Sequence, residues 1–311
     1  MPMDLSPKLS TQLQDPLNQL YRHRLAAFLV DHIRTSFITP NMLTFAHGTV
    51  GVGAAFLIYF QHYILAVLLF ELRTVLDCMD GILARMRGQH TGFGRVLDTI
   101  ADGIAFNAVM IAGALRMIQD FPSYEPSLIL ISVFCFALVA AQSGSIYQLM
   151  KRKLGSIILC QVDSVERDWR EHGMKVRGDS PSWVDQFGYW LDTMTIRFVS
   201  VEWYEKIKRR RNDPDWEACA LRDAKTMNEL ARITRKREFR HAVRFTSFVS
   251  DDNIFAVIGL CLLVLGAFPS QIFPHVHPVL VAFGAGLTFA LIALCIGLHY
   301  LHKFLHGVYR N

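Results

Sequence analysis

The sequence lacks the features that mark a secreted, disulfide-stabilised or zinc-binding protein. Its six cysteines are scattered along the chain and form no CxxC pair. This pattern indicates free thiols and argues against a disulfide framework or a cysteine zinc site. The first 20 residues contain no apolar core of the length that a cleavable signal needs, so we expect none. No internal repeat or low-complexity tract is present.

Positive charge is missing from three short loops, residues 61–62, 119–126 and 274–277. By contrast, 21 of the 32 Lys and Arg residues lie between Lys151 and Arg244. Cytoplasmic loops of membrane proteins are enriched in Lys and Arg, so this bias predicts that both termini and the basic region are cytoplasmic.

Hydrophobic residues make up 52% of the 311 residues, and the mean hydropathy is +0.26. This composition is too apolar for an ordinary soluble enzyme and predicts an all-α, polytopic membrane protein with six transmembrane helices. The six apolar segments are residues 42–60, 63–85, 95–118, 127–149, 253–273 and 278–301. We divide the chain into an N-terminal region (1–41), four spans (42–150), a cytoplasmic insertion (151–250) and two final spans with a tail (251–311).

Two regions outside the spans have distinct patterns. Residues 9–34 carry apolar positions at helical spacing with arginines between them, which predicts an amphipathic helix on the cytoplasmic membrane surface. A helix packed against the bundle is the alternative. The insertion contains all five tryptophans, which we expect to be divided between a small helical core and the headgroup region. Its basic runs, 206–211 and 235–240, fit contact with anionic lipid, so we predict no nucleic-acid partner.

Four aspartates lie close together where two apolar segments meet, in the stretch DCMDGILARMRGQHTGFGRVLDTIAD (77–102). On a helix that turns about 100° per residue, Asp77 and Asp80 lie about 60° apart. Asp98 and Asp102 lie one turn apart on the next helix. The short loop between the two helices makes them pack side by side, so the four carboxylates can converge on one pocket.

A carboxylate cluster near a bilayer is costly unless it is paired or binds cations. Oxygen ligands without His or Cys favour hard divalent cations such as Mg²⁺, Mn²⁺ or Ca²⁺, and a pair of such ions suits displacement at phosphorus. The small residues Gly81, Ala84 and Gly94 leave room beside the metals, and Arg85 supplies a charge for phosphate. These residues indicate phosphoryl-group transfer at the membrane boundary, and a structural carboxylate cluster or an ion path is the alternative.

The stretch resembles the signature D-x2-D-G-x2-A-R-x8-G-x3-D-x3-D of the CDP-alcohol phosphotransferase family. All eight fixed positions match: Asp77, Asp80, Gly81, Ala84, Arg85, Gly94, Asp98 and Asp102. The segment TPNMLT (39–44) is similar to a Pro-Asn-x-Leu-Thr element that the family carries ahead of its first span. The resemblance covers roughly residues 35–150 and the last two spans, and leaves the insertion outside.

The resemblance implies a six-helix membrane enzyme, a homodimer, that moves a substituted phosphoryl group from a CDP-linked donor to an alcohol acceptor and releases CMP. It implies two ions, Mg²⁺ or Mn²⁺, held by the aspartates, with Asp102 as a ligand or as the base that deprotonates the acceptor. The residues implied to hold the cytidine and diphosphate are Gly81, Ala84, Arg85, Gly94 and Asn41.

Several alternatives stay open at this point. Thr99 follows the third aspartate, where the choline and ethanolamine branch of the family commonly has His. The segment VLDTIADGIAF (96–106) resembles bacterial enzymes that use CDP-diacylglycerol. This resemblance implies a bacterial inner membrane, and a CDP-choline or CDP-ethanolamine donor is the alternative. Arg73 could bind a phosphate or the acceptor, or could pair with Asp77 or Glu71 as support. A non-catalytic membrane scaffold is a further alternative, and the intact set of four aspartates argues against it.

Overall fold

The computed structural model describes residues 18–89, 92–160, 164–178, 181–209, 251–267 and 277–309, with the single residues 215, 218 and 222. The elements in these residues are helical, as predicted: η1 (Asn18–Arg22), α2 (His23–Ile33), α3 (Pro40–Tyr59), α4 (Tyr63–Met86), α5 (Gly92–Asp120), α6 (Pro126–Cys160), α7 (Ser164–Lys175), α8 (Trp183–Val199), α9 (Val201–Arg209), α12 (Asp251–Ala267) and α13 (Pro278–Tyr309). The chain forms two compact units. The first combines Leu17–Ala141 with Asp251–Leu291, and the second includes Gln142–Ser250 and Ile292–Asn311.

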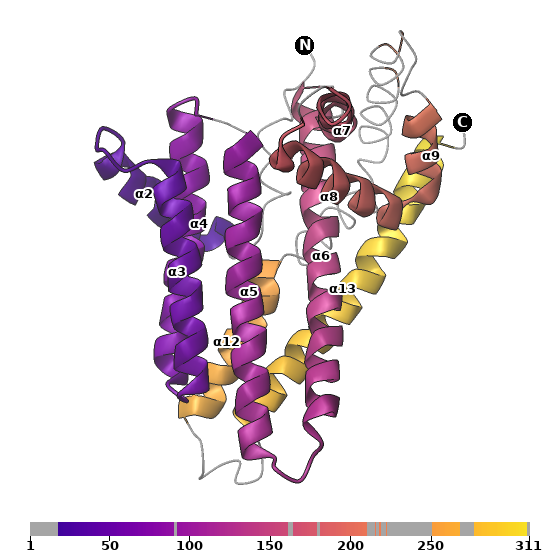
Figure 1. Ribbon diagram of the computed structural model, residues 1–311. Helices are drawn as coiled ribbons and strands as arrows, with labels where there is room; N and C mark the ends of the chain where they lie inside the picture. Colours follow the sequence, from indigo (N-terminus) through magenta and orange to yellow (C-terminus); the bar gives the residue numbers. More distant parts are fainter. Residues whose placement is uncertain are drawn as a thin grey trace. The chain divides into compact units, whose positions relative to one another are not determined.

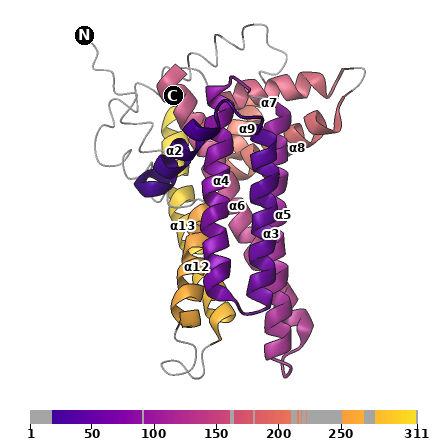
Figure 2. The ribbon, with the colours of Figure 1, turned by 90° about the vertical axis from the view of Figure 1, so that its left-hand side faces the viewer.

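Three long helices, α3, α4 and α5, lie side by side in the first unit (Figures 1 and 2), with α3 in contact with both α4 and α5. A Cβ atom built at Gly48 of α3 would lie 3.2 Å from the Cβ atom of Ala101 in α5. One built at Gly51 would lie only 2.4 Å from the Cβ atom of Ala105. Small residues at these four positions let the two backbones approach closely, which is a common means of helix packing in membranes.

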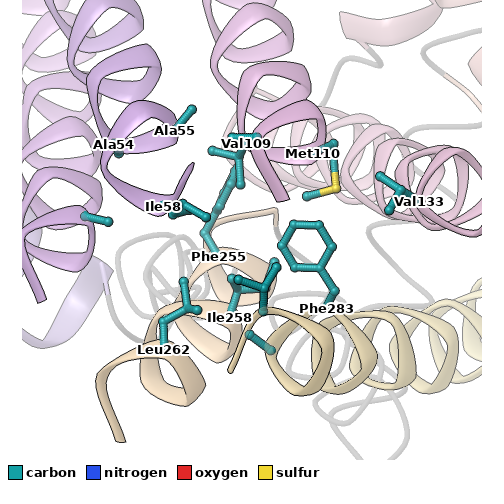
Figure 3. Close-up of a cluster of buried hydrophobic side chains, with 14 of the residues drawn as sticks. Ala54, Ala55, Ile58, Val109, Met110, Val133, Phe255, Ile258, Leu262 and Phe283 are labelled. Carbon is teal, nitrogen blue, oxygen red and sulfur yellow. The ribbon is translucent and has the colours of Figure 1, made fainter. Parts of the chain in front are cut away.

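An apolar cluster joins α12 and the start of α13 to these helices (Figure 3). Phe255, Ile258 and Leu262 of α12 lie in this cluster beside residues of α3 and α5. Phe283 of α13 and Met110 of α5 belong to the same cluster. Residues from the last part of the chain therefore support the helices that carry the aspartates.

Four helices are long and apolar enough to cross a membrane: Pro40–Tyr59, Val96–Asp120, Pro126–Lys153 and Pro278–Ile296. They coincide with four of the six predicted spans and indicate an integral membrane protein. The second predicted span corresponds to α4, whose 24 residues include Glu71, Arg73 and the first two aspartates, so its charge lowers its hydropathy. The fifth corresponds to α12, whose apolar part is Asn253–Val264, and residues 268–273 of that prediction lie outside the described residues. The count of six spans therefore stays a prediction.

The N-terminal helix predicted over residues 9–34 is represented by η1 and α2, and the first nine of these residues lie outside the described part. Ala26 and Val30 of α2 pack into a cluster with residues of α4. Leu25 and Phe28 are exposed. One side of α2 therefore contacts the bundle, as the alternative interpretation expected, and its location on the membrane surface stays a prediction.

An ion pair fixes the chain ahead of α2 to the middle of α4. Arg22 is 2% exposed and lies 2.5 Å from a carboxylate oxygen of Glu71. Tyr21 also donates a hydrogen bond to Glu71 through its hydroxyl. Glu71 is thus paired with residues of η1, and its pairing with Arg73 stays a prediction.

The second unit contains the described part of the insertion, α7, α8 and α9. Trp169 and Trp203 are buried in a cluster with side chains from the C-terminal part of α6. Trp183 and Trp190 of α8 are 60% and 53% exposed, and Trp216 lies outside the described residues. The four tryptophans of the insertion that the structure describes thus comprise two buried and two exposed side chains.

Candidate active site

Helical spacing brings the two aspartates of α5 to the face that contacts α3. Asp98, Ala101, Asp102 and Ala105 follow the i, i+3, i+4, i+7 pattern of one helix face. Since Ala101 and Ala105 make the close approach to α3, Asp98 and Asp102 lie on the same side of α5.

The facing stripe of α3 has the same spacing: Thr44, His47, Gly48 and Gly51, all of them buried. The two glycines provide the close contact with α5. The two polar side chains on this stripe are thereby placed beside the aspartates. The stripe lies outside the aspartate signature, and our sequence interpretation had not assigned His47 to the site.

The TPNMLT segment both begins α3 and orients one aspartate. Thr39 is the N-cap, and its hydroxyl accepts a hydrogen bond from the backbone N–H of Met42 at 3.3 Å. Pro40 follows at the first helical position, where its missing N–H has no cost. Thr44 then donates a hydrogen bond from its Oγ1 to Oδ2 of Asp80 at 2.6 Å. The segment therefore positions Asp80 from the neighbouring helix.

His47 lies among three carboxylates. Its Nε2 is 3.4 Å from Oδ1 of Asp98 and 3.7 Å from Oδ2 of Asp80, and its Nδ1 is 3.9 Å from Oδ1 of Asp102. The imidazole is fully buried, whereas the side chains of Asp80, Asp102 and Asp98 are 11%, 28% and 41% exposed. The site thus runs from a buried floor at His47 and Asp80 to a solvent-accessible edge at Asp98.

Within the described residues, His47, Asp77, Asp80 and Asp98 can hold a metal ion. Each offers one ligand atom, and these atoms all lie within 4.8 Å of one another. Two buried atoms of the group on different helices, Nε2 of His47 and Oδ1 of Asp98, have no hydrogen-bond partner in the described part of the chain. A mainly carboxylate donor set with unsatisfied buried atoms fits a hard divalent cation. Three of the four predicted metal ligands therefore belong to the group.

Asp102, the fourth predicted ligand, has a different environment. Its Oδ1 forms an ion pair with the Nη2 group of Arg73 on α4. Arg73 is 3% exposed, and its guanidinium carbon lies 5.4 Å from the centre of the Phe255 ring. The structure therefore gives Arg73 a contact with Asp102 that the sequence interpretation did not include.

The residues predicted to hold the cytidine and diphosphate lie at the adjoining helix ends. Gly81 and Ala84 are half-buried near the end of α4, and Gly94 is half-buried in the first turn of α5. Arg85 and Asn41 are exposed. A Cβ atom at Gly81 would lie 3.5 Å from Nη1 of Arg85, at ordinary van der Waals distance. Their contact with a donor stays a prediction.

Arg87 and Gly88 stabilise the C-terminal end of α4. They lie in the sequence between the two pairs of aspartates. Arg87 donates five hydrogen bonds, of 2.6–3.1 Å, to the backbone carbonyls of Ile33, Arg34, Ser36 and Ile38. This arrangement ties the segment between α2 and α3 to the end of α4. Gly88 has a φ of +62°, a conformation that ends many helices and favours glycine.

The part of the chain that carries these residues is similar to known proteins. A model of the CDP-alcohol phosphatidyltransferase family matches residues 37–159. The match covers α3, α4, α5 and nearly all of α6. It does not reach the last two predicted spans, which the resemblance was expected to include. No solved structure matches the chain at a significant level.

Three curated relatives are similar to part of the chain. Phosphatidylinositol phosphate synthase of Corynebacterium glutamicum is 36% identical over 106 residues, 34% of this chain and 47% of the relative. Ceramide phosphoethanolamine synthase of Drosophila melanogaster is 36% identical over 88 residues, 25% and 22% of the two chains. CDP-diacylglycerol–glycerol-3-phosphate 3-phosphatidyltransferase of Cereibacter sphaeroides is 37% identical over 95 residues, 29% and 41%.

The chain spans less than half the length of each of these relatives. Their names describe three different reactions, so the similarity does not identify a substrate. The matched residues contain the complete aspartate signature and the TPNMLT segment. The chain therefore carries, over residues 37–159, a domain of the CDP-alcohol phosphatidyltransferase family.

Proposed function

We propose that this chain transfers a substituted phosphoryl group from a CDP-linked donor to an alcohol acceptor and releases CMP. The observation that carries the proposal is the grouping of Asp77, Asp80 and Asp98 with His47, within the family domain. The donor is CDP-diacylglycerol in this proposal, which is also the donor in the name of the Cereibacter relative.

Asp77, Asp80 and Asp98 would hold two divalent ions, Mg²⁺ or Mn²⁺. When bound, such ions neutralise charge on the diphosphate and on the oxygen that is displaced. Thr44 keeps Asp80 in position through its hydrogen bond. The exposed edge at Asp98 leaves the site open to a water-soluble group.

Asp102 is proposed as the base. The acceptor oxygen forms a bond to the phosphorus that carries the lipid group, and the bond from that phosphorus to the bridging oxygen breaks. The electron pair of that bond leaves with CMP, and the hydroxyl proton passes to the Asp102 carboxylate. A positioned base of this kind contributes roughly 10² to 10⁴ in rate. Arg73 is a positioning residue, because its ion pair holds the Asp102 carboxylate beside the site.

The remaining roles follow from position. Gly81, Ala84, Arg85, Gly94 and Asn41 are proposed to line the site for cytidine and diphosphate. The lipid part of the donor would enter between helices, and a polar acceptor would arrive from the cytoplasm of a bacterium whose inner membrane holds the protein. The homodimer that the resemblance implies stays a prediction.

The test uses purified full-length protein in lipid vesicles with Mg²⁺. CDP-diacylglycerol and CDP-choline are each offered with a panel of alcohols, and CMP and the lipid product are both measured. We expect CMP and product in equal amounts from CDP-diacylglycerol with one class of acceptor. Asp80→Asn should abolish both, and Thr49→Ala is a matched control from an exposed position on α3.

Two other outcomes of this test would favour a different function. Transfer from CDP-choline alone would contradict the donor assignment and favour the choline branch. Absence of CMP with every donor, from protein that binds metal and remains folded, would favour the scaffold alternative.

A further inference from the structure

We propose that His47 is a nitrogen ligand of the metal site, so that the site takes Mn²⁺ in preference to Mg²⁺. The inference rests on the proposed function, since the metal is the one that would serve phosphoryl transfer. It adds to the aspartate signature a ligand of different chemistry from another helix.

Burial gives the first reason. His47 is 0% exposed, and neither ring nitrogen has a hydrogen-bond partner in the described residues. Buried polar atoms in folded proteins are nearly always satisfied, and those that are not call for an explanation such as an ion. A metal bound at Nε2 would satisfy one of these nitrogens.

The direction of the ring gives the second reason. Nε2 is the nitrogen nearer Asp80 and Asp98, at 3.7 Å and 3.4 Å, and Nδ1 is the one nearer Asp102, at 3.9 Å. Both distances from Nε2 to these carboxylate oxygens are longer than a hydrogen bond. Histidine ligands commonly direct their second nitrogen at a carboxylate, which fixes the tautomer and the ring orientation. Asp102 is the carboxylate on the Nδ1 side here, at 3.9 Å, which is longer than a hydrogen bond.

The fixed position of α3 gives the third reason. Gly48 and Gly51 hold α3 close to Ala101 and Ala105 of α5. The backbone of His47 therefore cannot move away from that of Asp98 without separating two tightly packed helices. The ligand geometry is built into the packing of the bundle.

The donor set predicts the metal preference. Carboxylate and water ligands suit Mg²⁺ and Mn²⁺ alike, whereas imidazole favours transition metals. A site with one nitrogen among carboxylate oxygens should therefore bind Mn²⁺ more tightly than Mg²⁺. The competing role for His47 is that of a charged imidazolium that only balances the carboxylates, and in that role its nitrogen would not be bonded to the metal.

Pulsed electron paramagnetic resonance of bound Mn²⁺ separates the two roles. Tag-free protein is loaded with Mn²⁺, and the modulation from nitrogen nuclei coupled to the metal is recorded with natural and with ¹⁵N-labelled histidine. We expect a nitrogen coupling that changes with the label. His47→Gln should remove it and weaken Mn²⁺ binding at least about tenfold, the lower end of the loss seen when a metal's supporting partner is removed. Mg²⁺ binding should weaken less.

His62→Gln, an exposed histidine after α3, is the matched control and should leave the coupling intact. Bound Mn²⁺ without a histidine coupling in the parent protein would overturn the inference and leave the proposed function standing. A coupling that persists in His47→Gln would also overturn it. Mn²⁺ binding that is absent, or unchanged by Asp77→Asn and Asp80→Asn, would instead refute the metal site of the proposed function and this inference with it.

Discussion

Gly51 offers the sharpest test of how the bundle positions the site. A Cβ atom there would lie 2.4 Å from the Cβ atom of Ala105, whereas carbon atoms in good contact lie about 3.5 to 4.0 Å apart. Gly51→Ala must therefore move α3 and α5 apart by about 1 Å. Because His47 and Asp98 lie on these two helices, the same movement should open the site.

The matched control is Gly53→Ala on the same helix, where a Cβ atom would meet only a Leu69 side-chain carbon at 3.4 Å. Both variants gain helix propensity, up to about 1 kcal/mol. Only Gly51→Ala carries the overpacking cost of about 1 to 3 kcal/mol. The difference in unfolding free energy between the two variants should therefore equal that cost.

The assay monitors thermal unfolding in detergent by circular dichroism. CMP release is measured in parallel. A displacement of about 1 Å can reduce turnover about a hundredfold, and we expect a loss of that order in Gly51→Ala. Adding Ala105→Gly should restore both properties, since it removes the colliding atom. Equal stability and activity in Gly51→Ala and Gly53→Ala would refute the close approach of the two helices.

Three further predictions concern the base, the α4 exit and the topology. Asp102→Asn should lower single-turnover CMP release at least about a hundredfold with nearly unchanged donor affinity, whereas Asp77→Asn should also weaken metal-dependent donor binding; equal loss of binding in both would make Asp102 mainly a ligand. Arg87→Ala should lower the unfolding free energy by about 1.5 to 3 kcal/mol, because a charged donor to four carbonyls is lost, and Arg87→Lys should recover only part of it; an unchanged melting temperature would contradict this role. A cysteine at the exposed Arg177 should resist an impermeant thiol reagent in intact bacteria and react after lysis, and labelling in sealed cells would overturn the cytoplasmic assignment.

The sequence predicted the parts of the molecule that depend on local pattern. Long apolar runs located the helices. The spacing within 77–102 predicted the meeting of Asp77, Asp80 and Asp98, because a short loop forces two neighbouring helices to pack together. The family domain was likewise predictable, since its eight signature positions lie within one continuous stretch.

Contacts between helices distant in the sequence were not predictable in the same way. His47 belongs to α3, and its approach to the aspartates depends on glycines meeting alanines across two helices. The spacing of Thr44, His47, Gly48 and Gly51 was a signal that could have marked this face. The spacing along one helix could suggest only partners on that helix for Arg73, such as Asp77 and Glu71. Its contact with Asp102 was missed because Asp102 lies on another helix.

The most direct test of the central claim is metal-dependent formation of CMP by the purified protein. CDP-diacylglycerol and the acceptor panel are supplied with the protein after chelation with EDTA, and CMP is measured before and after addition of Mg²⁺ or Mn²⁺. The account predicts no CMP without metal, recovery with either ion, and no recovery in Asp80→Asn. Full CMP release by demonstrably metal-free protein, or by Asp80→Asn, would contradict it.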